Sequence, residues 1–367
     1  MIKRRHISYL LMFFLTACVQ PVLDEEKGAP ILFGAEAQVE SVVVKSTGDT
    51  PSTSDSFLSD GSAFGVFGRW INAYQTDSLD TFFKQEVAYS NSSWTYSPLQ
   101  YWRKSGSYKF SAVYPFSTTC EDGSGPDRLV IKYSMHTGNN DLMAAKKVVS
   151  AFSGTGQPDP VTLQFHHACA AVRFLFKNGV DDDNTVTYHL DSFELQRLQT
   201  IGIFIFTSIP GEGEVISYDD WFRSSDHARA ASVYKWSAES ATDRVLIPRD
   251  YSSDDSENPG YAQKILEKND PKLPLWYFVI PQDLTEDDGS GYVPSVQFSV
   301  SVNDGVPVTS SLSLIKDILD RPIETTKWLP GYLYTYYIRI QRSQITMTVD
   351  VEPWDSYKVV VDDLIFE

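Results

Sequence analysis

Residues 108–115 read Tyr-Lys-Phe-Ser-Ala-Val-Tyr-Pro, so that Tyr108, Phe110, Ala112 and Tyr114 alternate with the residues between them. Successive side chains of a β-strand point to opposite faces, and this spacing therefore predicts a strand with one apolar face. Residues 161–176 predict a long strand or a bent pair of strands. Further strand-like runs lie at 31–44, 63–70, 193–206, 296–302, 332–340 and 345–351. Many short strands separated by turn residues, with few helix signals, predict an all-β protein built from β-sandwiches.

The length and charge of the chain narrow its class. It has 367 residues and a hydrophobic fraction of 42%, which predicts about two domains with real cores. The stretch 154–160, Gly-Thr-Gly-Gln-Pro-Asp-Pro, marks the expected boundary between domains at 31–157 and 158–367. The formal net charge of −17 has the wrong sign for binding nucleic acid or anionic headgroups.

The first twenty residues indicate export. A basic start at 3–5 is followed by an apolar run, Ile7 to Leu15, that is too short to span a bilayer. Leu15-Thr16-Ala17-Cys18 resembles the lipobox of bacterial lipoproteins, which implies that residues 1–17 are removed and that Cys18 carries the acyl chains. The alternative is an ordinary signal peptide. Residues 18–30 are then a tether.

Motifs for catalysis or metal binding are missing from the sequence, so no catalytic residue, metal or cofactor is expected. His166 and His167 adjoin on a predicted strand and point to opposite faces, which favours a structural role for one of them. Cys120 lies in a polar loop and Cys169 in an apolar run, a poor combination for a disulfide. Four tryptophans are expected in the core, although exposed ones could stack on sugars: Trp70, Trp94, Trp102 and Trp221.

Four groups of motifs together resemble the fimbrillin family, the pilin-like lipoproteins of type V pili. The first group is Pro30 to Ala35, Lys45-Ser46-Thr47 and Phe64 to Phe67. The second runs from Trp94-x-Tyr96 through Tyr101-Trp102 to Phe110-Ser111-Ala112-Val113-Tyr114-Pro115. The third is Asp141 to Ala145, Leu163 to His167 and Ala171 to Phe174. The fourth is Val279 to Gln282, Trp328-Leu329-Pro330-Gly331 with Tyr334 and Tyr336, and Val351 to Trp354.

This resemblance implies two tandem transthyretin-like antiparallel β-sandwich domains. It also implies that a protease cuts after a basic residue behind the first strand, and that a strand of the next subunit fills the opened groove. Lys45 stands where the family usually has Arg, so a different protease, or an uncut anchor subunit, is implied. The C-terminal segment is either the last strand of the second domain or the donor strand, with Val359, Val361, Leu364 and Phe366 as its apolar residues.

The resemblance therefore implies a non-enzymatic surface lipoprotein of the outer membrane that is a subunit of a type V pilus and supports adhesion. Its expected partners are other pilus subunits, the outer membrane through the lipid, and a ligand on a host or bacterial surface. Two other classes stay open from the sequence. One is a glycan-binding outer-membrane surface lipoprotein, and the other is a secreted hydrolase whose carboxylates are paired only in space.

Overall fold

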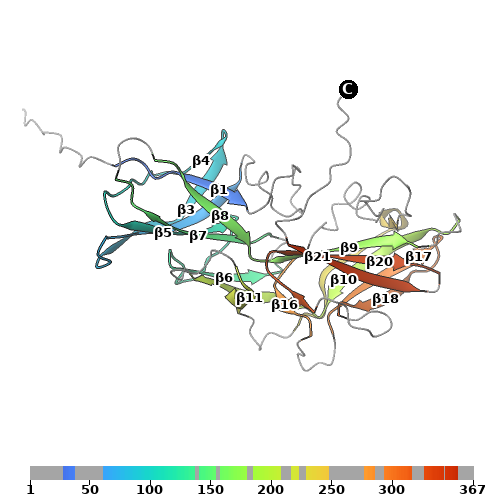
Figure 1. Cartoon of the computed structure of the whole chain (residues 1–367). Helices are drawn as coiled ribbons and strands as arrows, with labels where there is room; N and C mark the ends of the chain where they lie inside the picture. The colour runs from blue at the N-terminus through green and yellow to red at the C-terminus, as the bar shows by residue number, and fades with distance from the viewer. Residues whose placement is uncertain are drawn as a thin grey trace, which may run out of the picture.

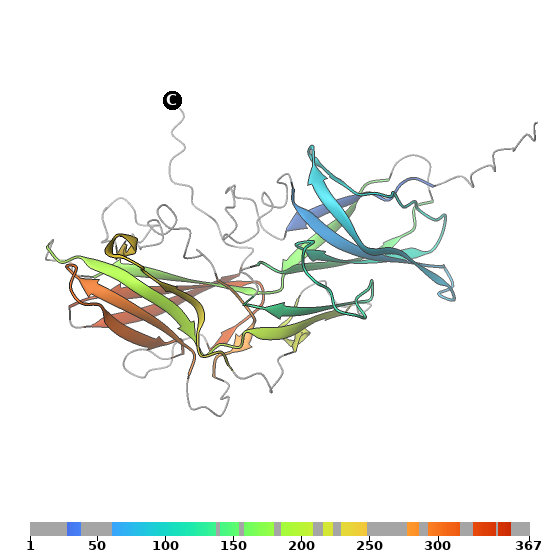
Figure 2. The same cartoon turned by 180° about the vertical axis from the view of Figure 1, so that it is seen from behind.

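The computed structural model describes residues 28–37, 61–136, 140–153, 158–179, 185–207, 216–222, 229–247, 277–285, 293–315, 326–342 and 344–353. Within these ranges the protein consists of β-strands and two single-turn 3-10 helices, η1 (Tyr218–Asp220) and η2 (Ala241–Asp243). The all-β prediction is confirmed. Figures 1 and 2 show an elongated molecule with one large sheet at one end and a sandwich at the other.

The large sheet has seven strands in the order β1-β8-β7-β5-β2-β3-β4. Their bounds are β1 (Phe33–Ala37), β8 (Val161–His167), β7 (Met143–Ser150), β5 (Ser107–Tyr114), β2 (Ala63–Ile71), β3 (Ser78–Ser90) and β4 (Ser93–Thr95). In β5, Tyr108, Phe110 and Ala112 are buried in one cluster as the alternation predicts. The other face of the sheet contributes Phe67 and Val113 to a second cluster.

The far end is a sandwich of two sheets. One has the order β15-β9-β20-β21, with bounds β15 (Tyr277–Val279), β9 (Ala170–Asn178), β20 (Tyr332–Ile340) and β21 (Ile345–Pro353). The other has the order β13-β10-β17-β18, with β14 also on β10, and bounds β13 (Val233–Ser237), β10 (Tyr188–Gln196), β17 (Ser295–Val302), β18 (Val308–Ser313) and β14 (Val245–Ile247). Ring contacts join the sheets, with centroids 5.1 Å apart for Phe176 and Phe298.

A three-stranded sheet, β12-β11-β6, connects the two ends. It is formed by β12 (Trp221–Phe222), β11 (Ile201–Thr207) and β6 (Arg128–Ser134). A two-stranded ladder, β16 (Gln282–Asp283) with β19 (Lys327–Trp328), completes the described strands. The indole of Trp221 donates to the carbonyl of Ala168, 2.8 Å away, where the chain passes from β8 to β9. Residues 161–176 are thus the bent pair of strands that the sequence allowed.

Strand pairing continues across the expected domain boundary. Strand β8 begins after residue 157, yet it pairs with β1 and β7, which precede it. Strand β6 likewise pairs along its length with β11 from the second half. A division between residues 157 and 158 would therefore separate β8 from both of its partners, because sheet hydrogen bonds join residues far apart in sequence. The two-domain organisation stays a prediction.

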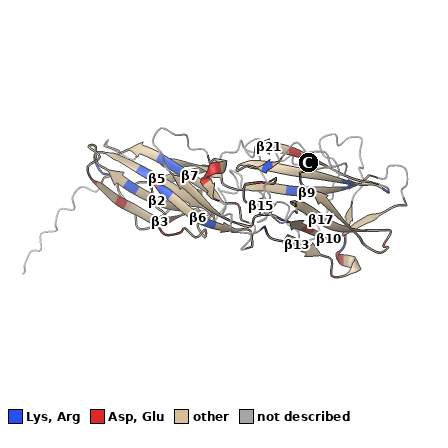
Figure 3. Ribbon diagram, turned by 90° about the horizontal axis from the view of Figure 1, so that it is seen from below, with Lys and Arg blue, Asp and Glu red and all other residues tan. Residues whose placement is uncertain are grey.

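Charge is distributed unevenly between the described residues and the rest of the chain. Acidic and basic residues are nearly equal in number within the described ranges, so most of the net charge of −17 lies outside them. Figure 3 shows basic positions on neighbouring strands of the seven-stranded sheet. Two of them, Arg69 on β2 and Lys109 on β5, stand opposite one another in the ladder.

Candidate functional site

The first described segment, residues 28–37, is hydrogen-bonded on both of its sides. On one side β1 runs parallel to β8, with Phe33 opposite Val161 and Ala37 opposite Phe165. On the other side, the amide of Ile31 donates to the carbonyl of Gln100 at 2.9 Å. The amide of Trp102 donates to the carbonyl of Ala29 at 3.0 Å. The segment is therefore held by residues 100–102 through its first residues and by β8 through its last five.

The side chains of this segment enter the core at every second position. Ile31, Phe33 and Ala35 are buried, at 0%, 3% and 7% exposure. The ring of Phe33 lies in a pocket of four aromatic rings, which we call the Phe33 pocket. Its centroid is 5.4 Å from those of Phe82 and Phe110, 5.7 Å from Tyr96 and 6.5 Å from Phe64. The contacts with Phe64, Phe82 and Phe110 are edge-to-face, and such contacts add to the free energy of burial.

Tyr96 ties the pocket to the backbone of the same segment. Its hydroxyl donates to the carbonyl of Ile31 at 2.7 Å. Burial raises the pKa of Tyr96 to about 12, so the hydroxyl keeps its proton at neutral pH and remains a donor.

Loss of residues 28–37 would leave a groove with a clear chemistry, which we call the first-strand groove. The edge of β8 and residues 100–102 would both expose unpaired amide and carbonyl groups. The bottom of the first-strand groove would expose the aromatic rings of the Phe33 pocket. Such a groove accepts an extended chain with apolar side chains at alternate positions, because that chain satisfies the backbone groups and the apolar surface together.

The other predicted site residues lie outside the described residues. These are Cys18, Lys45, Val359, Val361, Leu364 and Phe366. The sequence position of Lys45 is nevertheless informative, because it falls between the end of β1 at Ala37 and the start of β2 at Ala63. It is the only Lys or Arg between β1 and Arg69.

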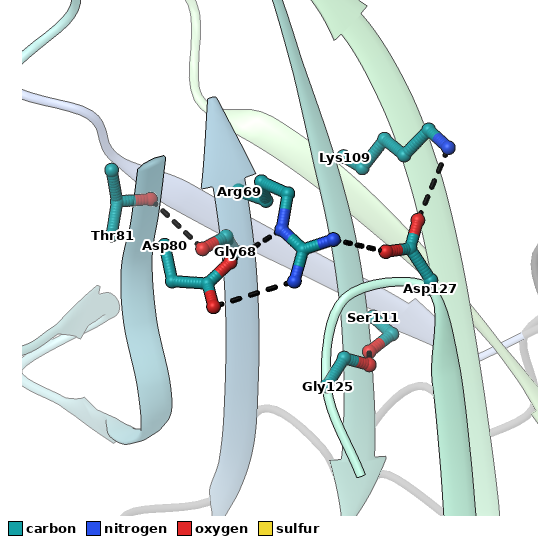
Figure 4. A network of polar contacts seen from close by, with 8 residues as sticks. All are labelled: Gly68, Arg69, Asp80, Thr81, Lys109, Ser111, Gly125 and Asp127. Carbon is teal, nitrogen blue, oxygen red and sulfur yellow. Dashed lines mark hydrogen bonds and ion pairs between the residues drawn. The ribbon is translucent and has the colours of Figure 1, made fainter. Parts of the chain in front are cut away.

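Arg69, the next basic residue, is held in a network of ion pairs (Figure 4). Its guanidinium contacts Asp80 through Nε at 2.5 Å and through Nη2 at 3.3 Å, and Asp127 through Nη1 at 2.5 Å. Lys109 reaches the other oxygen of Asp127 at 3.1 Å. Arg69 also lies on β2 between β3 and β5, so its peptide bonds are fully within the sheet. Folded protein therefore offers a protease poor access to Arg69.

We expect Arg69→Gln to lower the free energy of unfolding by about 1 kcal/mol, because the pair with Asp80 is bidentate but the whole network is partly open to solvent. Guanidinium unfolding at low and high salt measures the change, and salt should shrink the difference. Arg128→Gln, at an exposed position on β6, is the matched control. Equal effects of the two changes would contradict a specific role for the network.

A buried polar cluster lies where β8 meets β9. Nδ1 of His167 is 3.0 Å from a carboxylate oxygen of Asp141, with both side chains buried. This confirms a structural role for one of the two adjacent histidines. Cys120 and Cys169 are free thiols, and burial raises the pKa of Cys169 to about 12. A thiol in that state is a poor nucleophile.

The burial of His166 predicts that the stability of the protein depends on pH. Burial lowers its pKa to about 4, and nearby His167 and Lys146 act in the same direction. An unfolded histidine titrates near pH 6.5. The unfolded chain therefore binds more protons than the folded chain between these values, and stability falls as the pH drops through this window. We expect His166 to account for about 2 kcal/mol of lost stability between pH 7 and pH 5.

Denaturant unfolding of the parent and of His166→Gln at both pH values measures this effect. The variant should lose less stability than the parent between pH 7 and pH 5, whatever its stability at pH 7. His136→Gln, at an exposed histidine, is the control. Parallel pH profiles for the parent and His166→Gln would contradict the assignment.

Three of the four tryptophans that the sequence places in the core are buried. Trp70, Trp102 and Trp221 have exposures of 8%, 6% and 3%. Trp94 is half-buried and packs on Phe64, with centroids 4.9 Å apart. Stacking of a glycan on Trp70, Trp102 or Trp221 would therefore require the core to open.

In the described ranges no cluster of three or more His, Cys, Asp or Glu side chains is arranged to hold a metal ion. The same residues include no helix with the length and hydrophobicity needed to cross a membrane.

Comparison with known proteins identifies the family. The model of a family described as fimbrillin-like matches residues 50–354, so the chain belongs to the fimbrillin-like family. A fimbrial protein from Bacteroides vulgatus has a similar fold, with a TM-score of 0.55 at 14% identity, over 88% of this chain and 99% of that one. A candidate cell adhesion protein from Bacteroides uniformis aligns with a TM-score of 0.48 at 16% identity. The alignment covers 89% of this chain and 99% of that one. No curated protein matches the sequence.

Proposed function

We propose that this protein is a non-enzymatic subunit of a type V pilus, and that the first-strand groove is its assembly site. The observation that carries the proposal is the two-sided pairing of residues 28–37 between β8 and residues 100–102. Membership of the fimbrillin-like family supports the same role. The fold of the Bacteroides vulgatus fimbrial protein is consistent with it.

Assembly then follows from the physical state of the opened groove. After removal of the first strand, an exposed sheet edge and the Phe33 pocket are both costly in water. A strand donated by another copy restores the hydrogen bonds and fills the pocket. Because the donor and the groove are different surfaces, each copy can accept one neighbour and donate to another, and the chain of copies grows without closure.

Processing at Lys45 would release the first strand. A cut there separates β1 from β2, whereas a cut at Arg69 would have to break the seven-stranded sheet. In this proposal, the donor is the C-terminal segment that contains Val359, Val361, Leu364 and Phe366. Cys18 carries the lipid that holds the precursor on the outer membrane, since multiple acyl chains give stable anchoring. Binding of a host or bacterial surface ligand would be the adhesive role of the pilus.

The test is to express the full-length protein on the cell surface and run it on a gel without boiling. N-terminal sequencing of the bands follows. A ladder whose subunits start at Ser46 is expected. A single lipidated species starting at Cys18, with no ladder, would overturn the role as a polymerising subunit. That result would instead fit an anchor or a solitary surface protein.

A further inference from the structure

Two apolar features among the described residues lie uncovered at opposite ends of the protein. One is a pocket of about 770 Å³ between the two sheets of the sandwich. The other is the turn at residues 72–77, between β2 and β3, where Tyr74 is 85% exposed. We propose, on the basis of the proposed function above, that Tyr74 of one copy inserts into this pocket of the next copy.

The pocket, which we call the end pocket, lies between β18 and the turn that joins β20 to β21. Its buried wall is formed by Tyr188, Val300, Leu312 and Ile340, and its rim carries Val308, which is 64% exposed. Five hydroxyl and amide side chains also line it: Ser310, Ser311, Ser313, Gln341 and Gln344. This mixture suits a tyrosine, because the ring is apolar and the buried hydroxyl requires a hydrogen-bond partner.

The turn between β2 and β3 presents Tyr74 on a braced backbone. The side chain of Asn72 accepts a hydrogen bond from the amide of Thr76 and donates one to its hydroxyl, both at 2.9 Å. The amide of Asn72 donates to the carbonyl of Asp77 at 2.9 Å, and the amide of Gln75 donates to the carbonyl of Asn72 at 3.0 Å. A turn that is already ordered loses little conformational freedom on binding.

The strand ladders place the turn and the end pocket far apart in one copy. Ile71, the last residue of β2, pairs with Ser107 at the end of the large sheet that is remote from His167. Ile340, which lines the pocket, pairs with Asn178 at the last residue of β9. Figures 1 and 2 show the large sheet and the sandwich at opposite ends of the molecule. Tyr74 therefore cannot reach the end pocket of its own copy, and the contact joins different copies in head-to-tail order.

The charges on the two surfaces are complementary. In the described part of the chain, Arg342 is the only charged residue that lines the end pocket. Asp77 is exposed and is the only charged residue of the turn. With Tyr74 in the pocket, Asp77 would lie at the rim, where Arg342 provides the opposite charge. Such pairs favour one partner and one orientation more than they add affinity.

Strand donation, as proposed above, supplies a second copy at this end. Strand β21 starts at Ile345, which lines the end pocket, and its nine residues lead about 30 Å back to Pro353. Residues 354–367 would span about 46 Å if extended. The donor is therefore long enough to pass the end pocket and to pair with the next copy there.

The contact is too small to hold two copies together alone. A turn of six residues compares with about 20–30 residues on each side of a standard interface. Strand donation would raise the effective concentration of the two surfaces, and the contact would then stiffen and stabilise the polymer. We therefore expect purified precursor to stay monomeric, and the contact to form in the polymer.

Cross-linking in the surface-expressed, full-length protein tests the contact. The test pair is Ala73→Cys with Val308→Cys in a Cys120→Ser background, which keeps Tyr74 and the buried wall of the end pocket. The control pair is Ala73→Cys with Phe222→Cys, because Phe222 is also exposed but lies on the three-stranded sheet. A short bis-maleimide joins the thiols, so that linkage does not require the geometry of a disulfide.

We expect the test pair to give a covalent ladder of this chain that survives boiling, and the control pair to give none. If the parent forms an unboiled ladder that the test pair does not link, or links no better than the control pair, the contact is overturned and the proposed function is not. Linkage of Val308→Cys to a different protein would also overturn the contact. If the Cys120→Ser parent forms no ladder even without boiling, the proposed function has failed and this contact fails with it.

Two exposed aromatic residues give an independent readout. In isolated polymer, at a guanidinium concentration that releases few parent subunits, Tyr74→Ser should raise the released fraction by about tenfold. Phe83→Ser, at a 75% exposed position on β3, should leave the released fraction within about twofold of the parent. Neither change should alter guanidinium unfolding of the precursor, because both side chains are exposed. Equal release from the two variants would contradict Tyr74 as the residue that fills the end pocket.

Discussion

Replacing Phe33 by alanine is expected to lower the free energy of unfolding of the unprocessed subunit by about 3–5 kcal/mol, the usual cost of emptying a buried phenylalanine site. The ring is 3% exposed and touches four others, so the surrounding strands cannot easily close the space. Guanidinium unfolding of the precursor measures the loss. Leu32→Ala, at the half-buried neighbouring position of the same segment, should cost about 1 kcal/mol or less.

The same substitution distinguishes the unprocessed precursor from the subunit in the assembled polymer. If β1 is removed during assembly, Phe33 is absent from the mature polymer, and Phe33→Ala should leave the thermal stability of the ladder unchanged. A ladder that melts at a lower temperature in Phe33→Ala would mean that β1 stays in the assembled subunit. Similar losses for Phe33→Ala and Leu32→Ala in the precursor would contradict the buried aromatic pocket as the main contact of the strand.

Replacing Lys45 by glutamine is expected to abolish the ladder and to leave a single species that starts at Cys18. No other Lys or Arg lies between β1 and Arg69, and Arg69 is enclosed by β3 and β5 and paired with Asp80 and Asp127. A protease that requires a basic residue therefore has no second site that would release β1 from the folded protein. Gel electrophoresis without boiling, with N-terminal sequencing, measures the outcome.

Lys27→Gln is the matched control, because Lys27 precedes β1 and a cut there leaves the strand in place. It should assemble like the parent. Lys45→Arg should also assemble, and its processing should become sensitive to Arg-specific proteases. An unchanged ladder in Lys45→Gln would show that the first strand is released elsewhere or is not released.

The strand that forms part of the candidate site could be predicted from the local sequence. The sequence predicts strand-like pieces at residues 31–44, and β1 occupies Phe33–Ala37. The signal that marks β1 as unusual is not local, however. β1 pairs with Val161 to Phe165, and the residues just before it, Ala29 and Ile31, are hydrogen-bonded to residues 100–102. The alternation of residues 31–37 alone does not indicate which of these distant residues they join.

Strands β3 and β6 are not among the strands predicted from the sequence. Strand β3 is the longest in the described residues, but bulges interrupt its pairing with β2, and Lys84 within it has φ +50°. A bulge shifts the side chains by one face and breaks the alternation that identifies a strand. Strand β6 does alternate, with Leu129, Ile131 and Tyr133 buried, and its period-two signal could have been found.

The sequence by itself determined the all-β class, the strand character of residues 161–176, the expectation of export and the family resemblance, because these depend on neighbouring residues and on the order of short motifs. The tertiary structure decided what those motifs do. It set Phe33 among rings from four distant segments, divided residues 161–176 into β8 and β9, enclosed Arg69 between two strands, and paired residues 28–37 with both β8 and residues 100–102. The physical reason is that strand pairing and core packing join residues far apart in the chain, and each contact depends on both partners being in place.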